Sequence, residues 1–437
     1  MKWTALTSAF SMFLSGALAH ELPLRAGLTN PCKGREFEGY NAPYYNITFN
    51  DHGFTGASID KGSRFGHAVA SASNYFISAA THGDNESGVV YVFNNLGKGW
   101  SQSQEINAVY PSETSLHMGE SLDMCTKYKT IVIGDSRAHN RSGAVHLYEL
   151  DQETGQFVLS QTITNPASKA GDRFGCSVSI NKQYLVVGAF GHDNGAMNTG
   201  AAYIYSRNGS GHQFSLLQNL TESITSQDSF GTAVAIHGET VVVGAPGAEN
   251  GNGLARIYQL EQNKSEFELS HTQTGSTLQN LGEVVEVNDK TVLLSGAGDH
   301  GAGEVLVYAL QEEYPGWTQV DTLTAPDGDE HDLFGSSIDI NGDDIVIGAK
   351  YSGAEGACAG SVYYYHKLFN EWHFAARLAH PMDYNKRTNT LDYFGTSVSI
   401  EPSEHKIIVG ATGNDDLGSH AGLVDMFDIQ DMQNFLE

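Results

Sequence analysis

Hydrophobic and polar residues follow one pattern that recurs along most of the chain. In residues 174–189, FGCSVSINKQYLVVGA, apolar and small polar residues alternate, a polar break follows, and an apolar run ends in Gly-Ala. Alternation predicts a strand with one buried face, and a continuous apolar run is consistent with a strand buried on both faces. A third run, GAAYIY, and a weaker fourth, such as FVLSQTIT, complete the pattern. Each unit therefore predicts four strands.

The pattern occurs seven times and is an internal repeat. A Phe-Gly pair opens five units, and Met-Gly or Leu-Gly opens the other two. The openings lie 51 to 60 residues apart, at Phe65-Gly66, Met118-Gly119, Phe174-Gly175, Phe230-Gly231, Leu281-Gly282, Phe334-Gly335 and Phe394-Gly395. Four-stranded units with this period, and with glycine at the tight positions, are typical of propeller blades.

We therefore predict an all-β fold, a seven-bladed β-propeller of four-stranded antiparallel blades. The repeated Phe is expected to lie between adjacent blades, and the glycine after it to allow close backbone approach. The seventh unit lacks a good fourth strand, so we expect residues 44–50, YYNITFN, to supply the outer strand of the last blade. The propeller then spans residues 44–430, and residues 431–437 form a tail.

The first residues have the pattern of a secretory signal peptide. Lys2 precedes an apolar run that ends at Leu14, and an Ala-x-Ala sequence ends at Ala19. We expect residues 1–19 to be removed, residues 20–43 to form a lead-in, and the mature protein to be secreted and extracellular. Six Asn-x-Ser/Thr glycosylation sequons agree with that location: Asn46, Asn85, Asn140, Asn208, Asn219 and Asn263.

The cysteine count also agrees with an oxidising compartment. Four cysteines allow two disulfides with three possible pairings, and their spacing does not resemble a zinc site. They are Cys32, Cys125, Cys176 and Cys358. We expect Cys32 to pin the lead-in.

Charge limits the range of partners. Of the 437 residues, 40% are hydrophobic and 17% are charged, which is typical of a globular protein, and the net charge is −27. An acidic surface repels nucleic acid and anionic membranes, so neither is expected as a partner. No segment after the signal peptide has the length and apolarity of a membrane span. A cationic partner, or a neutral one such as a sugar, remains compatible with this charge.

The Phe-Gly and Gly-Ala-Pro elements resemble the FG-GAP repeat, which builds the seven-bladed propeller of integrin α subunits. The resemblance covers approximately residues 44–430, with seven copies in register. It implies an extracellular propeller that recognises proteins or carbohydrates. It also implies that the ligand binds the face that carries the 4–1 and 2–3 loops, which join strand four to the next blade's strand one and strand two to strand three.

Calcium is the cofactor that the resemblance raises, and the sequence departs from the family there. The family often has a loop of the form Asp-x-Asp/Asn-x-Asp-Gly-x-x-Asp between the first two strands. Unit six offers Asp339, Asn341 and Asp343 at alternate positions, but its loop is shorter and lacks the late acidic ligand. A two-residue hairpin turn at Asn341-Gly342 explains the same residues. No other cofactor is expected.

The long polar connections before each Phe-Gly and after each second strand are expected to share one face. Rigid strands that hold variable loops make a natural binding surface. Histidines and aspartates gather in these loops and can ligate a metal or bind sugar hydroxyls, or they can be ordinary turn residues. The candidates are His82, Asp84, His139, His192, Asp193, Asp299, His300, Asp415, Asp416 and His420.

These features favour a secreted recognition or adhesion module that binds an extracellular protein or glycan through its loop-rich face. The alternatives are a structural component of a matrix or wall and, less favoured, a secreted hydrolase with a carboxylate pair. The sequence has no Gly-x-Ser-x-Gly elbow, no phosphate-binding loop and no His-Glu-x-x-His motif, so we predict that it is not an enzyme.

Overall fold

The computed structural model is built almost entirely from β-strands. It describes residues 51–56, 59–110, 117–209, 213–221, 227–275, 279–296, 301–311, 316–353, 358–380, 391–401, 403–416 and 419–429. Within these ranges the strands form seven sheets of four, which we call blades I to VII. The helices described there have four residues each: α1 (Gly83–Glu86), α2 (Ala138–Arg141) and α3 (Ala248–Gly251).

The strands follow the chain from blade to blade, except that the last blade takes its fourth strand from the N-terminal side. Blade I contains β2 (Phe65–Ala72), β3 (Tyr75–Ala80), β4 (Val89–Asn95) and β5 (Trp100–Asn107). Blade II contains β6 (Leu122–Cys125), β7 (Thr130–Asp135), β8 (Ala144–Leu150) and β9 (Phe157–Thr164). Blade III contains β10 (Val178–Ile180), β11 (Tyr184–Ala189), β12 (Ala201–Arg207) and β13 (Phe214–Leu220). Blade IV contains β14 (Val234–His237), β15 (Thr240–Ala245), β16 (Leu254–Gln259) and β17 (Glu268–Thr274). Blade V contains β18 (Val285–Asn288), β19 (Thr291–Gly296), β20 (Glu304–Gln311) and β21 (Gly316–Leu323). Blade VI contains β22 (Phe334–Asn341), β23 (Asp344–Ala349), β24 (Ser361–Leu368) and β25 (Glu371–Leu378). Blade VII contains β26 (Phe394–Glu401), β27 (Lys406–Ala411), β28 (Leu423–Asp428) and β1 (Asp51–Phe54).

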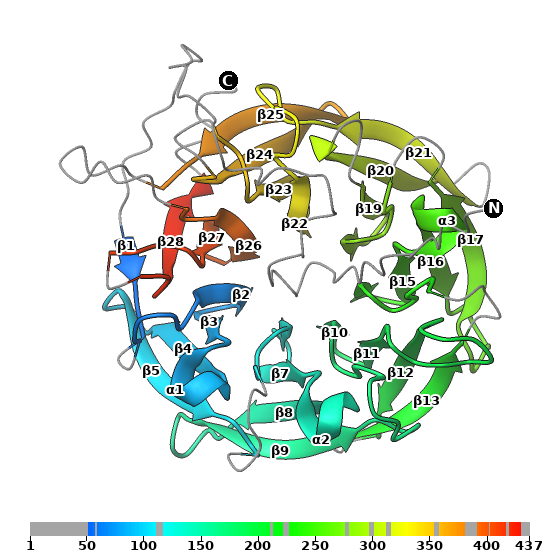
Figure 1. The fold of residues 1–437 in the computed structure, drawn as a ribbon, viewed down its shortest axis with the longest axis horizontal. Helices are drawn as coiled ribbons and strands as arrows, with labels where there is room; N and C mark the ends of the chain where they lie inside the picture. The colour runs from blue at the N-terminus through cyan, green and yellow to red at the C-terminus, as the bar shows by residue number, and fades with distance from the viewer. Residues whose placement is uncertain are drawn as a thin grey trace, which may run out of the picture.

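The blades are arranged radially around an axis, and their strands run antiparallel from the centre to the rim (Figure 1). In blade III, Val187 on β11 is paired with Val178 on β10 and with Tyr203 on β12. The first strand of each unit is innermost and the fourth is outermost. The prediction of a seven-bladed propeller with four-stranded antiparallel blades is confirmed.

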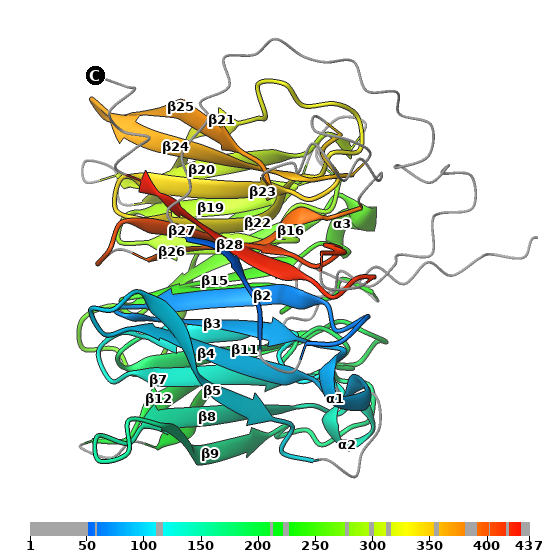
Figure 2. The same cartoon turned by 90° about the vertical axis from the view of Figure 1, so that its left-hand side faces the viewer.

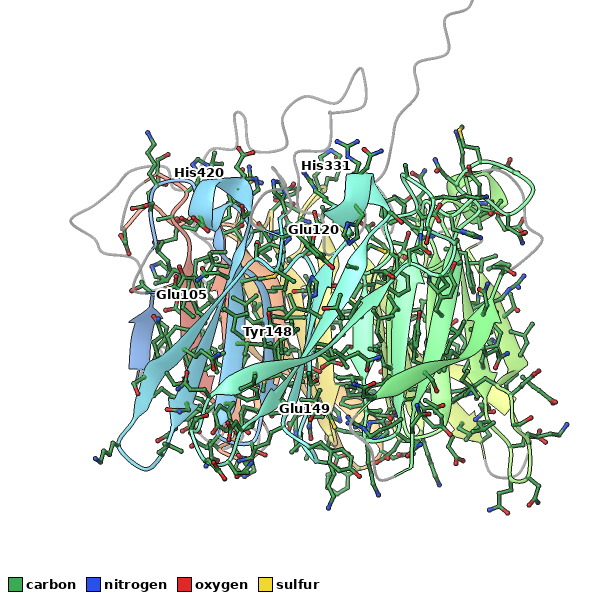
Figure 3. The ribbon with its side chains drawn as sticks, turned by 90° about the horizontal axis from the view of Figure 1, so that it is seen from below. Glu105, Glu120, Tyr148, Glu149, His331 and His420 are labelled. Carbon is green, nitrogen blue, oxygen red and sulfur yellow. The ribbon has the colours of Figure 1, made fainter. Side chains whose placement is uncertain are left out.

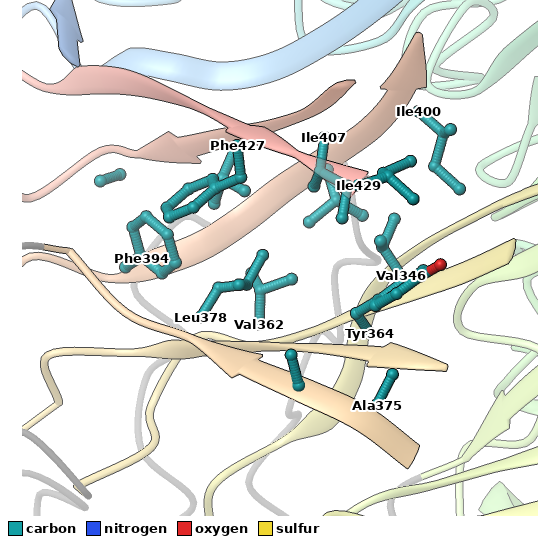
Figure 4. Close-up of a cluster of buried hydrophobic side chains, with 14 of the residues drawn as sticks. Val346, Val362, Tyr364, Ala375, Leu378, Phe394, Ile400, Ile407, Phe427 and Ile429 are labelled. Carbon is teal, nitrogen blue, oxygen red and sulfur yellow. The ribbon is translucent and has the colours of Figure 1, made fainter. Parts of the chain in front are cut away.

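Seven large apolar clusters hold the ring together, one between each pair of neighbouring blades. Phe174 is fully buried between Leu147 of blade II and Tyr203 of blade III. Figure 4 shows the corresponding cluster between blades VI and VII, where the ring of Phe394 lies 5.9 Å from that of Phe427. The expectation that the repeated Phe lies between blades is confirmed.

The motif glycines lie where neighbouring blades come closest. Gly200, which precedes β12 and has a φ of 86°, forms a parallel bridge with Phe230 of the next blade. A Cβ atom on Gly200 would overlap the carbonyl oxygen of Phe230, and one on Gly188 would overlap that of Gly231. A side chain is therefore excluded at both positions by sterics, and at Gly200 also by backbone conformation. The Gly-Ala element of one blade thus meets the Phe-Gly element of the next.

The ring is closed by an N-terminal strand. β1 pairs antiparallel with β28, with Phe54 opposite Val424, and the two strands lie side by side in Figure 1. At the same junction, Phe65 of blade I forms a parallel bridge with Gly422 of blade VII. Closure of the last blade by an N-terminal strand is confirmed with residues 51–54 as the described strand. Residues 44–50, to which we assigned that strand, lie outside the described residues.

A repeated side-chain clamp joins outer strands. Gln161 in β9 donates a hydrogen bond from Nε2 to the carbonyl oxygen of Phe214 (2.8 Å) and accepts one at Oε1 from the Phe214 N–H (2.8 Å). Two further clamps of this kind join Gln104 to Phe157 and Gln218 to Phe267. The rims of blades I to IV are therefore linked through backbone groups as well as through apolar packing.

The long connections lie on one face of the ring, which we call the loop face. Their backbones bond to each other: the His82 N–H donates to the Ser63 oxygen (3.2 Å), and the Gly191 N–H donates to the Asp172 oxygen (3.1 Å). Figure 2 shows α1, α2 and α3 together on that side. Tight turns occupy the opposite face, as at Gly342 (φ 59°) between β22 and β23. The expected sharing of one face by both sets of connections is confirmed.

The cysteines depart from the predicted pattern. Cys125 and Cys176 are buried and free, so the two disulfides that four cysteines allow do not form. Cys125 packs in the apolar cluster between blades II and III, and the Cys176 thiol donates to the Gly231 carbonyl oxygen next to blade IV (3.4 Å). Burial raises the pKa of the Cys176 thiol to about 12. Cys358 is fully buried, and Cys32 lies outside the described residues.

The sequons that the structure describes with their side chains are exposed: Asn140, Asn208, Asn219 and Asn263. Asn46, the signal peptide, the lead-in and the tail, residues 431–437, lie outside the described residues, and nothing is described of the Asn85 side chain. Across the described residues, no helix has the length and apolar character that crossing a bilayer requires.

Candidate ligand-binding face

Each 4–1 connection reaches the axis in the same backbone conformation. The residue before each opening Phe, Met or Leu has a φ between 54° and 59°, which is uncommon for a residue with a side chain. These residues are Arg64, His117, Arg173, Ser229, Asn280, Leu333 and Tyr393. Because each precedes an innermost strand, the seven form a ring at the inner margin of the loop face.

A buried carboxylate organises the polar side chains of blade II. Glu120 is 1% exposed and accepts hydrogen bonds from the Ser136 hydroxyl and from Arg137 Nε (2.9 Å). His117 Nδ1 lies 3.9 Å from Glu120 Oε1. Burial raises the pKa of Glu120, and the nearby charge of Arg137 opposes that rise. Figure 3 shows Glu120 beneath the loop face, on which His331 and His420 also lie, whereas Glu149 lies toward the opposite face.

A second histidine, His82, lies beside His117. The rings of His82 and His117 are 4.2 Å apart between centroids. Burial, followed by the charges of Arg64, His67 and Arg137, lowers the pKa of His82 to about 4. His82 is therefore neutral at physiological pH.

Arg173 adds a cation from blade III. Burial lowers the pKa of its guanidinium, Glu120 opposes that effect, and Arg137 and Arg141 add to it. Its Nη1 atom is buried and has no hydrogen-bond partner among the described residues. A buried guanidinium nitrogen without an acceptor is costly, and an anionic ligand would satisfy it. We call Arg64, Arg137, Arg141, Arg173 and Lys350 the basic cluster.

A small hollow opens on the loop face where blades VI, VII and I meet. Its volume is about 70 Å³, and it is lined by Arg64, Lys350, Tyr351, Tyr393, Thr396, Thr412 and His420. The Tyr351 and Tyr393 rings meet edge to face at 5.7 Å. The Arg64 N–H donates to the His420 carbonyl oxygen (3.1 Å), which fixes one wall of the hollow across the closing junction.

Lys350 is the half-buried cation of this hollow. Burial lowers the pKa of its ammonium group, and the charge of Glu283 in blade V opposes that effect. No ion pair joins Lys350 to a carboxylate within the described part of the chain. Its Nζ lies 5.6 Å from the centre of the Tyr351 ring. The hollow thus holds a partly desolvated cation that an acidic group could approach.

The predicted loop residues do not form one constellation. His139 is exposed and its ring lies 4.5 Å from that of Tyr110, tilted by 58°, whereas His192 is buried with Nδ1 3.3 Å from Asp172 Oδ2. Asp193 accepts a hydrogen bond from the Asn198 N–H (2.8 Å) and closes its own loop. These side chains shape separate 2–3 connections.

The remaining predicted residues are also spread over the loop face. Asp415 accepts the His420 N–H (2.6 Å), and Asp416 is half exposed, 3.8 Å from His380. Asp84 is exposed on α1. His420 contributes to the hollow, and His82 to the histidine pair. Asp299 and His300 lie outside the described residues.

The suggested calcium ligands are used otherwise. Asp339 Oδ1 accepts the Ile340 N–H (2.8 Å) and Oδ2 accepts the Ile400 N–H (2.7 Å). Asn341 and Asp343 flank the tight turn between β22 and β23. Among the described residues, no group of three or more His, Cys, Asp or Glu side chains is arranged to hold a metal ion.

Three carboxylates lie on the innermost strands, five residues after the opening residue of their units. Asp123 Oδ2 accepts the Ile180 N–H of blade III (2.7 Å), just as Asp339 bonds to blade VII. Burial raises the pKa of Asp123 to about 7 and that of Asp339 to about 6, and it raises the pKa of Glu286 well above its usual value. In blades II and VI these carboxylates cap the free inner edge of the next blade.

Comparison with known proteins supports the repeat assignment. Residues 157–205, 222–258 and 317–365 match the FG-GAP repeat family. Three segments of this seven-bladed propeller thus match the FG-GAP repeat, and the resemblance to that repeat is confirmed. The first and third matches begin on the outer strand of one blade and end on the third strand of the next, so the sequence unit straddles two blades. No curated relative matches the chain in sequence.

Solved structures share the fold at low identity. A protein provisionally named a 6-phosphogluconolactonase from Bacteroides uniformis matches with a TM-score of 0.50 and 12% identity, over 77% of this chain and 87% of that chain. Its counterpart from Bacteroides fragilis matches with a TM-score of 0.50 and 12% identity, over 80% and 88%. Sqt1 of Saccharomyces cerevisiae matches with a TM-score of 0.49 and 12% identity, over 88% and 87%. At this identity the two Bacteroides proteins indicate the fold alone. An FG-GAP propeller fits an interaction module, and such repeats are typical of extracellular proteins.

Sequence reasoning missed the basic cluster. Three of its members, Arg64, Arg173 and Lys350, occupy repeat positions where several other units have uncharged residues. Arg64 and Arg173 directly precede the opening Phe, where units four and five have Ser229 and Asn280. Lys350 follows Gly-Ala, in the place of the proline of a Gly-Ala-Pro element. A comparison of the seven units position by position would have revealed these departures.

Proposed function

We propose that this protein is a secreted recognition module that binds an extracellular protein or glycan through its loop face, without turnover of the ligand. The observation that carries the proposal is the gathering of the basic cluster around the axis of that face. A protein with a net charge of −27 has few cations. Five of them lie among the connections that are free to vary without disturbing the ring, and two of the five, Arg173 and Lys350, are partly desolvated.

Two members of the basic cluster, Arg173 and Lys350, support binding because burial makes their charges costly to keep without a ligand. A desolvated cation is stabilised when an acceptor replaces the water it has lost. Arg173 Nη1 has no such acceptor among the described residues. The aspartates and histidines that close the loops supply rigidity, which lowers the entropic cost of binding.

The test is capture of a ligand, followed by localisation of its site. The full-length mature protein, enzymatically deglycosylated, is applied to glycan and matrix-protein arrays with and without a chelator. Each ligand found is then titrated against two charge reversals: Arg141→Glu on the loop face and Lys182→Glu in the turn that ends β10 on the opposite face. Both side chains are exposed, so neither change should unfold the ring.

The proposal expects that Arg141→Glu weakens binding several-fold, that Lys182→Glu leaves it unchanged, and that no product of the ligand accumulates. Equal loss with both variants, or loss with Lys182→Glu alone, would reject the loop face. Capture of no ligand together with self-association would favour the structural alternative. Release of a product would favour a hydrolase.

Secretion is part of the same proposal and has its own test. Expression of the whole chain in a eukaryotic secretory host should yield a secreted protein that begins at His20. Glycosidase treatment should lower its mass through the exposed sequons. Because Cys125 and Cys176 are free, we propose a single disulfide between Cys32 and Cys358. Mass measurement of the alkylated protein before and after reduction should then reveal one disulfide.

A further inference from the structure

We propose that the hollow between blades VI, VII and I binds one acidic group of a sugar, a carboxylate or a sulfate, with Arg64 and Lys350 as its counter-charges. This inference rests on the proposed recognition function and names the ligand class of one part of the loop face. Its basis is the composition of the hollow and the state of the lysine in it.

Lys350 supplies the first argument. It follows β23 directly, so the rigid second strand of blade VI fixes its backbone, and its N–H lies 3.3 Å from Ser336 Oγ. The ammonium group is partly desolvated and makes no ion pair in the described part of the chain. Glu283 acts on it across the blade interface without closing a salt bridge. An acidic ligand would complete the coordination of this cation without displacing a protein partner.

Size supplies the second argument. A volume of about 70 Å³ is roughly half that of a cavity of about 150 Å³ that admits a benzene ring, so the hollow suits one carboxylate or sulfate head group rather than a whole sugar ring. The hollow therefore accepts a single charged substituent, and the rest of the ligand must lie across its mouth. The net charge of −27 disfavours a polyanion that covers a wide surface, so a short acidic oligosaccharide is the better match.

The aromatic pair favours a sugar over an acidic peptide. Tyr351 and Tyr393 meet at nearly right angles, with planes 68° apart, and both line the hollow next to Lys350. Phenol rings beside a cation offer an apolar surface for the C–H face of a sugar. Tyr393 is also held by the bond from Thr396 Oγ1 to its carbonyl oxygen (2.7 Å), so its backbone is fixed before a ligand arrives.

The test uses the full-length mature protein and defined trisaccharides in calorimetric titrations. The acidic probes are a galacturonic acid trisaccharide and a 6-sulfated galactose trisaccharide, and the neutral counterpart is a galactose trisaccharide. Lys350→Gln removes the charge at similar length, and Lys350→Arg keeps it. Lys61→Gln makes the same change at an exposed residue of the 4–1 connection of blade I and serves as the matched control.

The expected result is binding of at least one acidic trisaccharide, weakened about tenfold or more by Lys350→Gln and retained by Lys350→Arg and Lys61→Gln. The two acidic probes distinguish a carboxylate from a sulfate source. Loss of a charge-assisted contact accounts for this size of effect. Thermal unfolding of each variant shows that its fold is intact.

Three results would overturn the inference. The first is that the neutral trisaccharide binds as tightly as the acidic ones, and the second is that Lys350→Gln binds them like the parent protein. The third concerns a tetraglutamate peptide titrated in the same way: it binds and depends on Lys350, while neither acidic trisaccharide binds. These failures differ from failure of the proposed function. If an array ligand responds to Arg141→Glu but not to Lys350→Gln, the loop face is a binding surface and the hollow is not its acidic subsite.

Discussion

The carboxyl groups with raised pKa values on the innermost strands should make the propeller more stable at pH 5 than at pH 8. Asp123 of blade II is half-buried, and its oxygens accept the N–H groups of Met124 (2.7 Å) and Ile180 (2.7 Å). Despite these bonds, burial raises its pKa to about 7. The perturbation that isolates this group is Asp123→Asn, which keeps the shape and removes the titration.

The sign follows from linkage. A carboxyl whose pKa is higher in the folded state binds its proton more tightly there, so its stabilising contribution is complete below the unfolded pKa of about 4 and is lost as the pH rises through about 7. Between pH 5 and pH 8, this single group should lower the free energy of unfolding by about 2–3 kcal/mol, at about 1.4 kcal/mol per pH unit over most of that window. Asp339 and Glu286 act in the same direction.

The assay is urea unfolding at pH 5, 6, 7 and 8, followed by tryptophan fluorescence. The parent protein should lose stability across the series, and Asp123→Asn should lose about 2–3 kcal/mol less between pH 5 and pH 8. At pH 5 the variant should be weaker by about 1 kcal/mol, because the amide offers one acceptor to two N–H donors. Asp151→Asn is the control, because backbone hydrogen bonds from Glu153 and Thr154 lower the pKa of the Asp151 carboxyl, which therefore does not titrate between pH 5 and pH 8. An Asp123→Asn curve parallel to that of the parent would refute the reasoning.

Three further substitutions test the contacts between blades by the same urea unfolding at pH 6. Phe174→Ala should cost about 3–5 kcal/mol, because the ring is fully buried between blades II and III, whereas Phe374→Ala at the exposed rim should cost far less. Gln161→Ala should cost about 1–2 kcal/mol through loss of both bonds to Phe214, with exposed Gln213→Ala as the control. Gly200→Ala should cost about 3 kcal/mol or more, because backbone strain adds to overlap with Phe230. Gly155 also has a positive φ, but a Cβ atom there would meet open space, so Gly155→Ala should cost only the backbone strain. Equal losses of stability for Gly200→Ala and Gly155→Ala would contradict the close-approach argument.

The ring could be predicted from sequence because the same local pattern recurs seven times. Repetition averages out the ambiguity of any one strand, and glycine with a following apolar run is a strong local signal. The role of Phe174 between blades followed from the need of each blade to bury two faces. The meeting of Gly188 with Gly231 did not follow, because the repeat shows which positions are equivalent and not which positions touch across an interface.

The sequence predicted which connections share the loop face, but not which of their side chains would be available to a ligand. The spacing of the repeats placed His82 and His192 on it, but whether such a side chain meets a ligand or closes its own loop depends on contacts between connections roughly a blade apart in sequence. His192 is a case of the second kind, since it lies against Asp172. The cations at Arg173 and Lys350 escaped notice because the search followed histidines and aspartates as metal and sugar ligands. These two cations are notable because neighbouring blades bury them, and the sequence alone does not show which residues neighbouring blades bury.

The pairing of β1 with β28 means that the ring cannot close until synthesis of the chain is almost finished. Residues 51–54 leave the ribosome nearly a whole chain before residues 423–428, on the order of tens of seconds at ordinary translation speed. During that interval the first strand has no partner, and the flank of blade I that later meets blade VII stays open to water. A nascent chain with an unsatisfied edge and bare apolar surface is prone to misassembly with its neighbours. Efficient production should therefore depend on chaperones that shield early blades until the final strand emerges.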